Sequence, residues 1–226
     1  MNVLIVTTSC NMLAPDHPTG LWLEEFAVPF TAFSEAGASI RVVSPKGGAV
    51  PIDPKTAPTE KDREKWPAAL QALSSTGRLA EVAADRFDAV FIPGGHGPMV
   101  DLVNDQQLQR LLAAFDRDGK MVAAVCHGPA ALLNVRNAAG EPLVKGRKVT
   151  GFTNVEERLV LLHSVVPFLL EDALKERGAN FESALLPFFS HVVRDENLIT
   201  GQNPASSTKV AEELLAALEE GSRLTS

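Results

Sequence analysis

MVAAVCHGPAAL, residues 121–132, is the stretch that decides the fold. It begins with a short apolar run, and small residues stand two positions before and two positions after Cys126. A buried parallel strand that ends in a tight turn and leads into a helix has this pattern. The stretch therefore predicts an exposed, strained cysteine at the carboxyl end of a strand, with a helix beginning at Gly128.

The strand pattern of this stretch recurs along the chain and alternates with helical patterns. Such alternation predicts an α/β fold with a mostly parallel central sheet between helical layers. The predicted strands are 2–7, 39–44, 86–92 and 121–125, and the predicted helices between them are 21–35 and 105–117.

Two later segments are interpreted separately. Residues 45–80 are rich in Pro, Lys, Asp and Thr and interrupt the alternation. They predict an insertion with a helix over 60–73, and we assign no catalytic residue to them. The last helix is expected to have Asn203 as its N-cap and Pro204 at its first position.

Composition sets limits on the class of protein. The 226 residues are 45% hydrophobic and 22% charged, with a formal net charge of −7, which suits a single domain spanning 1–226. The charged residues form no long block of one sign, which argues against nucleic acid or a membrane surface as the main partner. The N-terminal run predicts a core strand rather than a signal peptide, and two cysteines are too few for a disulfide framework. We expect a cytoplasmic protein without a metal site.

Cys126 is the candidate nucleophile. Backbone N–H groups at the start of the expected helix favour a thiolate and predict a lowered pKa. The alternative is a buried structural thiol, which is the reading for Cys10 because it lacks the turn frame. His127 is either the base that activates Cys126 or only its neighbour.

Other candidates come from the first helix and from the remaining histidines. Glu25 shares a helix side with Trp22, which favours a semi-buried carboxyl that holds its proton near neutral pH, although Glu24 looks equivalent. His96, in the loop PGGHG, either lines the pocket or caps the turn, and His17 is placed near the pocket mouth. The structural histidines are His163 and His191, because no ligand-spaced residues accompany them.

Six segments in order resemble the ThiJ/PfpI superfamily. In particular they are similar to its heat-shock chaperone and glyoxalase III-like branch, which implies a class I glutamine amidotransferase-like, flavodoxin-like three-layer sandwich. The segments are TGLWLEEFAVPF (19–30), AGASIRVVSPKGGAVPID (36–53), FDAVFIPGGHGPMVDL (87–102), AVCHGPAALL (124–133), VTGFTNVEE (149–157) and LITGQNPASS (198–207).

The resemblance implies a role for each candidate. Cys126 is the nucleophile, and Glu25 is the glutamate over its sulfur. Glu157, in preference to Glu156, is the acid that orients His127. The backbone N–H groups of Gly95 and His127 form the oxyanion hole.

The resemblance also implies an activity. It is that of a glutathione-independent glyoxalase III, a lyase of the D-lactate dehydratase type, which converts the 2-oxoaldehyde methylglyoxal to lactate without a cofactor, in a homodimer. Hydrolysis by a peptidase, amidase or protein deglycase is the alternative at the same site, and a stress-response holding chaperone or redox sensor is the non-enzymatic one. A glutaminase is disfavoured, because its late catalytic His and Glu lie two residues apart, whereas Val193 follows His191 at that distance.

Overall fold

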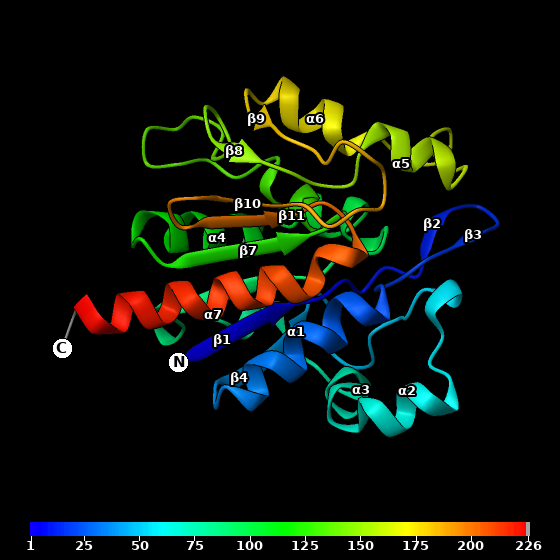
Figure 1. Ribbon diagram of the computed structural model, residues 1–226, viewed down its shortest axis with the longest axis horizontal. Helices are drawn as coiled ribbons and strands as arrows, with labels where there is room; N and C mark the ends of the chain where they lie inside the picture. Colours follow the sequence, from blue (N-terminus) through cyan, green and yellow to red (C-terminus); the bar gives the residue numbers. More distant parts are fainter. Residues whose placement is uncertain (225–226) are drawn as a thin grey trace.

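A seven-stranded sheet forms the middle of the computed structural model, which describes residues 1–224 (Figure 1). Its strand order is β10-β11-β7-β6-β1-β4-β5. All neighbouring strands run parallel except β10 and β11. The predicted α/β fold with a mostly parallel sheet is confirmed. The strands are β1 (Asn2–Val6), β4 (Ser39–Ser44), β5 (Gly77–Arg78), β6 (Ala89–Ile92), β7 (Met121–Val125), β10 (Val192–Asp195) and β11 (Leu198–Gly201).

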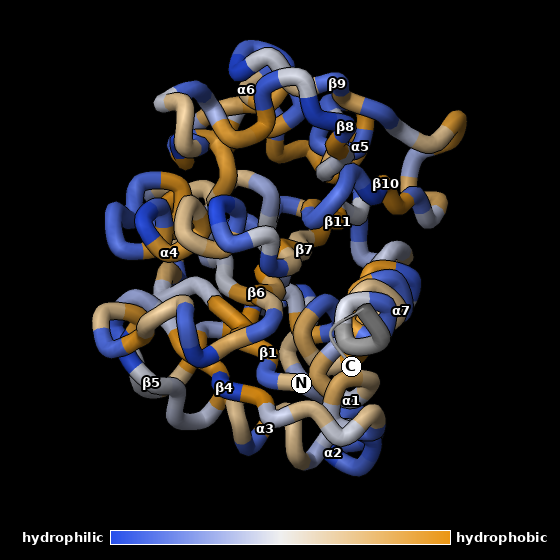
Figure 2. Tube along the Cα trace, turned by 90° about the vertical axis from the view of Figure 1, so that its left-hand side faces the viewer, coloured by the Kyte–Doolittle hydropathy of each residue, from blue (hydrophilic) through white to orange (hydrophobic). Residues whose placement is uncertain are grey.

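Helices cover both faces of this sheet, so that the molecule has three layers. Figure 2 shows α4 on one side of the strands and α1 with α7 on the other, and α1 packs against α7. The helices are α1 (Leu23–Glu35), α2 (Glu60–Lys65), α3 (Pro67–Ser74), α4 (Gln106–Arg117), α5 (Asn154–Leu159), α6 (Leu170–Glu176) and α7 (Ser207–Leu224). None of the described helices is long and apolar enough to cross a membrane.

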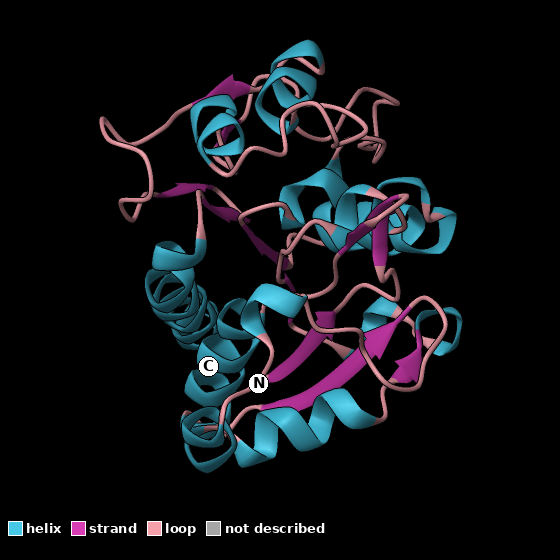
Figure 3. Ribbon diagram, turned by 90° about the vertical axis from the view of Figure 1, so that its right-hand side faces the viewer, coloured by secondary structure: helices cyan, strands magenta, loops and turns pink. Residues whose placement is uncertain are grey.

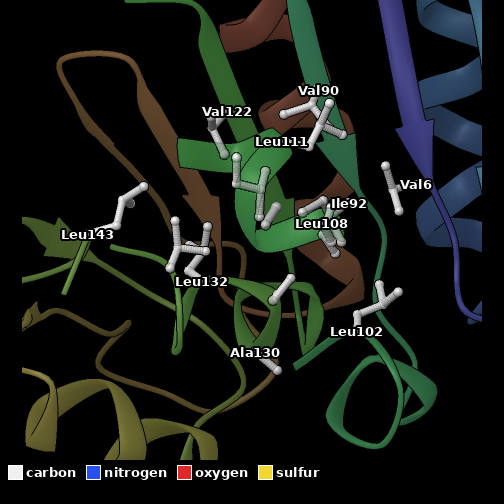
Figure 4. Close-up of a cluster of buried hydrophobic side chains, with 14 of the residues drawn as sticks. Val6, Val90, Ile92, Leu102, Leu108, Leu111, Val122, Ala130, Leu132 and Leu143 are labelled. Carbon is white, nitrogen blue, oxygen red and sulfur yellow. The ribbon is translucent and has the colours of Figure 1, made fainter. Parts of the chain in front are cut away.

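The core is divided by the sheet into two clusters. β1, β6 and β7 alternate their side chains between the two faces, so a strand buried on both sides must be apolar throughout. Figure 4 shows the cluster on the α4 side, where Leu108 and Leu111 of α4 meet Val90, Ile92 and Val122 of the sheet. On the opposite face, α1 and α7 contribute residues such as Phe26, Phe33 and Leu214.

Several sequence predictions differ from the observed elements. The single helix expected over 60–73 is two helices, because Pro67 lacks the N–H that would continue the first. The helix expected from Gly128 is only a 3₁₀ helix, Gly128–Leu132, whose residues are all buried and leave no polar face. Asn203 makes no side-chain cap, and α7 begins three residues after Pro204. The short pairs β2 (Met12–Ala14) with β3 (His17–Pro18) and β8 (Lys148–Val149) with β9 (Asn180–Phe181) were not expected.

The chain changes direction across the sheet at β1. From β1 it continues to β4 on one side, and it then returns to β6 on the other. Loops that leave neighbouring strands in opposite directions open a crevice at their carboxyl ends. Figure 3 views the molecule from this side. The crevice between β1 and β6 is therefore where a site is expected, and Cys126 follows β7, the strand beside β6.

Candidate active site

Cys126 stands at a strained turn directly after β7. Its φ is +60°, in the left-handed region that side chains with a Cβ rarely adopt. Its N–H donates to the Gly201 carbonyl at 2.9 Å, and its own carbonyl accepts from the Phe152 N–H at 2.9 Å. Gly128 has no Cβ, and one placed there would lie 2.3 Å from the Ile92 carbonyl oxygen. The strained elbow is present as the sequence predicted.

Two expectations about the Cys126 thiol are wrong. The residue is only 4% exposed, and burial together with the Glu25 carboxyl beside it raises the pKa of the thiol well above its usual value. Only a 3₁₀ helix follows the turn, so there is no long helix to stabilise a thiolate. In this structure Cys126 is a thiol that must lose its proton during the reaction.

His127 lies between Cys126 and a carboxylate. Its Nδ1 is 3.4 Å from Cys126 Sγ, and its Nε2 is 2.7 Å from Glu157 Oε2. Burial and the neighbouring His96 lower the pKa of His127 to about 4, so its imidazole is neutral at neutral pH. An ionised carboxylate only accepts, so Nε2 carries the proton and Nδ1 is left free to accept the proton of the thiol. This is the arrangement of an activated nucleophile.

Glu157 is the acid that faces His127, and it has a second partner. Its Oε1 is 2.9 Å from His96 Nε2, and the two imidazole rings lie 4.0 Å apart between centroids. Burial alone would raise the pKa of Glu157, but the two imidazole N–H donors outweigh it and lower the pKa to about 2. Glu156 points elsewhere, toward Thr153 and Asn203.

Glu25 is fully buried, whereas Glu24 is exposed. The Gly94 N–H donates to Glu25 Oε2 at 2.8 Å, and the carboxyl lies against the Cys126 thiol. Burial raises the pKa of Glu25 to about 8, although the contacts with Cys126 and Gly94 oppose this shift. Glu25 therefore holds a proton at neutral pH, next to the sulfur.

The backbone donors expected to form the oxyanion hole lie at the same place. Gly95 has φ +81°, and a Cβ there would lie 2.2 Å from the Gly20 carbonyl oxygen, so the loop approaches the start of α1 as only glycine allows. Gly95 and His127 both line the pocket, and the Gly95 N–H faces the Glu25 carboxyl. Their role in binding an oxyanion stays a prediction.

Gly95, His96, Cys126 and His127 line a cavity of about 160 Å³, whereas Glu25 and Glu157 lie behind them and are not part of its lining. Apolar side chains that the sequence analysis did not single out form most of its walls, and Lys55 enters it from the predicted insertion. Phe152 lies in the segment VTGFTNVEE, and Phe188 lies in the loop before β10. Only the fold shows that both residues line the pocket. The lining residues are Trp22, Lys55, Gly95, His96, Cys126, His127, Phe152, Val160, Phe188 and Pro204.

The two histidines considered near the pocket, His96 and His17, differ in their position. His96 lines the pocket, whereas His17 lines a neighbouring hollow of about 230 Å³ that shares His96 and Lys55 with it. Hollows of about 450 and 500 Å³ elsewhere contain neither cysteine nor histidine.

The side chains of His96, His127 and Glu157 also offer three ligand atoms within 4.8 Å of one another, a spacing that a metal ion could use. Sequence spacing gave no sign of this cluster, because its members come from three separate segments. The two hydrogen bonds to Glu157 already account for the convergence, and a cation would have to displace both protons.

Comparison with known proteins identifies the family. The sequence profile of the DJ-1/PfpI family matches residues 19–217. The chain belongs to the DJ-1/PfpI family. The sequence is 30% identical to "Glutathione-independent glyoxalase HSP31" of Saccharomyces cerevisiae, over 96% of this chain and 98% of that protein.

Solved structures of this family superpose closely on the chain. Glyoxalase III from Candida albicans is 29% identical, with a TM-score of 0.87 over 96% of this chain and 97% of that one. The Rapid Encystment Protein of Francisella tularensis is 36% identical, with a TM-score of 0.90 over 96% of this chain and 98% of that one. The family resemblance drawn from the six sequence segments is confirmed.

Proposed function

We propose that this protein is a glutathione-independent glyoxalase that converts methylglyoxal to lactate. The observation that carries the proposal is the buried Glu25 carboxyl, which holds a proton against Cys126 at the edge of the pocket. Acyl transfer needs a thiol, a base and an acid, but isomerisation of an oxoaldehyde also needs a group that moves a proton between adjacent carbons. The relatives named as glyoxalases support this choice.

The first step is addition of the thiol to the aldehyde. Cys126 Sγ forms a bond to the aldehyde carbon while its proton passes to His127 Nδ1, 3.4 Å away. Glu157 stabilises the imidazolium that forms. The aldehyde oxygen becomes an alkoxide, for which we propose the His127 and Gly95 N–H groups as donors, and it takes the proton from the imidazolium to give a hemithioacetal.

The second step is an internal redox change. Glu25 gives its proton to the ketone oxygen, and the resulting carboxylate removes the hydrogen of the carbon bonded to sulfur as a proton, which leaves an enediol. Glu25 then gives that proton to the neighbouring carbon and takes up the proton of the hydroxyl beside sulfur, which yields a 2-hydroxy thioester and restores the protonated Glu25. Water then attacks the thioester, the C–S bond breaks, and lactate and the thiol are released. The apolar walls limit the access of bulk water to the enediol.

Replacing the thiol tests the proposal. Cys126→Ala should abolish lactate formation from methylglyoxal without glutathione, and Glu25→Gln should lower kcat by roughly 10²–10⁴-fold, the usual share of general acid–base catalysis. The matched control is Glu24→Gln, which alters the exposed neighbour and should keep wild-type kcat. Wild-type turnover by the Cys126→Ala variant would refute the proposal.

Hydrolysis is the second candidate, favoured by the chain of contacts from Cys126 through His127 to Glu157. That chain suffices for acyl transfer and does not use Glu25. NMR of the products separates the two: lactate from methylglyoxal marks the glyoxalase, and amine release from a glycated or peptide substrate marks the hydrolase. A hydrolase should also tolerate Glu25→Gln.

A further inference from the structure

Glu156 is a fully buried carboxylate that accepts hydrogen bonds from neutral donors on both oxygens. Oε1 accepts from the Phe188 N–H at 2.7 Å and from the side-chain amides of Gln202 and Asn203 at 2.9 and 2.8 Å. Oε2 accepts from the N–H and the hydroxyl of Thr153, both at 2.9 Å. Each donor needs an acceptor when buried, and the two oxygens of Glu156 accept all five of these hydrogen bonds.

The donors belong to three chain segments that build one wall of the pocket. Thr153 follows the wall residue Phe152, Phe188 is itself a wall residue, and Asn203 precedes the wall residue Pro204. Glu156 therefore joins all three segments at a single point. The reaction as described makes no use of this carboxylate.

Phe188 depends on this contact more than the other wall residues do. Its φ is +63°, which is strained for an aromatic residue, and its side chain is 44% exposed. Figure 2 shows a chain segment with hydrophobic residues that projects beside β10. In the loop that holds Phe188, Leu185 and Phe189 are 98% and 62% exposed. Packing therefore contributes little to holding Phe188 in its strained conformation.

Two further anchors of the loop also lead back to Glu156. The Ala184 N–H donates to Gln202 Oε1 at 2.8 Å, and the Asn203 side-chain amide donates to the Phe189 carbonyl at 2.9 Å. Gln202 and Asn203 are both held by Glu156 Oε1. Loss of this acceptor would loosen the loop at every one of these points.

We propose that Glu156 is a positioning residue that holds Phe188 in the wall of the pocket that contains Cys126 and thereby limits the size of the group that reaches the thiol. The two aromatic rings of Phe188 and Phe152 lie 6.3 Å apart between centroids, on the wall of a cavity of about 160 Å³. If Phe188 relaxes to a negative φ, its ring leaves this wall and the pocket widens. The consequence for substrate choice rests on the proposed glyoxalase function, whereas the consequence for access to Cys126 does not.

Alkylation of Cys126 measures the width of the pocket without any turnover. In a Cys10→Ala background, the rates of adduct formation at Cys126 are compared for iodoacetamide, a small reagent, and N-phenylmaleimide, a bulky one. Glu156→Gln places an amide group among donors, so we expect the rate ratio of the bulky to the small reagent to rise about fivefold or more, as a contact of about 1 kcal/mol implies.

Phe188→Ala should raise the ratio similarly, and the double variant should show no further rise, because both changes act on one wall. The matched control Glu24→Gln should leave the ratio unchanged. If Glu156→Gln does not fold, Gln202→Leu takes its place. This change removes the Gln202 amide that donates to Glu156 Oε1 and should give a smaller rise of the ratio. An equal change for both reagents, or fully additive effects of Glu156→Gln and Phe188→Ala, would overturn the proposal.

Turnover gives the second reading. Glu156→Gln should lower KM for phenylglyoxal relative to KM for methylglyoxal, since a wider pocket admits the larger substituent, and an unchanged KM ratio would contradict the role in substrate choice. Absence of turnover by the wild type with either aldehyde would refute the glyoxalase proposal, and the alkylation ratio would still decide the role of Glu156.

Discussion

Glu24 and Glu25 are adjacent carboxyls with opposite environments. One is exposed, and the other is buried against a thiol with its pKa raised to about 8 from 4.5. Between these two pH values the folded chain keeps a proton that the unfolded chain has lost. The slope of stability with pH follows the difference in bound protons, so ionisation of Glu25 destabilises the folded state as pH rises through this window.

Glu25→Gln should remove this pH dependence. We expect the free energy of unfolding of the wild type, measured relative to the Glu25→Gln variant, to fall between pH 4.5 and pH 8 by on the order of a few kcal/mol. Denaturant titrations at a series of pH values measure it. The low pKa values of His127 and Glu157 affect both proteins alike and cancel in the difference. Parallel curves for the two proteins would contradict the raised pKa, and Glu24→Gln should follow the wild type.

At the residue scale, the sequence alone could identify Cys126, because small residues around a thiol after an apolar run have few other uses. It could not choose between Glu156 and Glu157 from chemistry, since only the direction of each side chain on α5 separates them. The burial of Cys126 could not be predicted either. Phe152, Phe188 and Lys55 come from distant segments and carry no local signal of a pocket. The roles of the site residues stay predictions until variants are measured.

The loop after β6 shows how an element constrains the site. Gly95 is the residue at which the loop meets the start of α1, where a Cβ would lie 2.2 Å from one backbone oxygen and 2.7 Å from the Trp22 nitrogen. Backbone atoms cannot move aside as a flexible side chain can. A larger residue must therefore separate β6 from α1, and with it Gly94 from Glu25.

Gly95→Ala should be far more costly than a comparable change elsewhere. Gly119 also has a positive φ, +65°, but nothing lies within 4 Å of the position of its Cβ. Gly119→Ala should lower the free energy of unfolding by about 1 kcal/mol, and Gly95→Ala by at least about 2 kcal/mol more. Urea denaturation of both variants provides the comparison. Equal losses would show that the close approach of the loop to α1 has no energetic weight.

Prediction of the elements succeeded where the local pattern is strong and failed where tertiary contacts decide. β7 is apolar and buried throughout and has the predicted bounds, and β4 also has the predicted bounds although only Val43 and Ser44 of it are fully buried. Asn203 is a strong N-cap residue by type, yet its side chain bonds to Glu156 instead. Tertiary acceptors of this kind leave no trace in the local sequence.

At the scale of the whole molecule, the seven-stranded sheet has a separate apolar cluster on each face. Phe33 belongs to the cluster under α1, and Phe115 belongs to the cluster under α4. Residues without shared partners have additive effects on stability. The two clusters should therefore respond independently to changes in packing.

Phe33→Leu and Phe115→Leu should each lower the free energy of unfolding by about 1–2 kcal/mol. The double variant should lose the sum within about 0.5 kcal/mol, as measured by urea denaturation with fluorescence and circular dichroism in parallel. A coupling much larger than this would mean that strain passes through the sheet.

The family and the three-layer fold were predictable from the sequence, because patterned strands and six ordered motifs agree. The single domain, the insertion at 45–80, the homodimer and the cytoplasmic location remain predictions.

The spread of the site along the chain affects its synthesis. Cys126 donates its N–H to Gly201, Glu25 lies far upstream, and the wall that Glu156 fastens ends at Pro204. A growing chain therefore carries a thiol without its surrounding pocket from the moment residue 126 leaves the ribosome until nearly eighty more residues have followed. A prematurely ended chain would present a bare cysteine without its pocket, so translation must pass β11 before the thiol becomes a selective reagent.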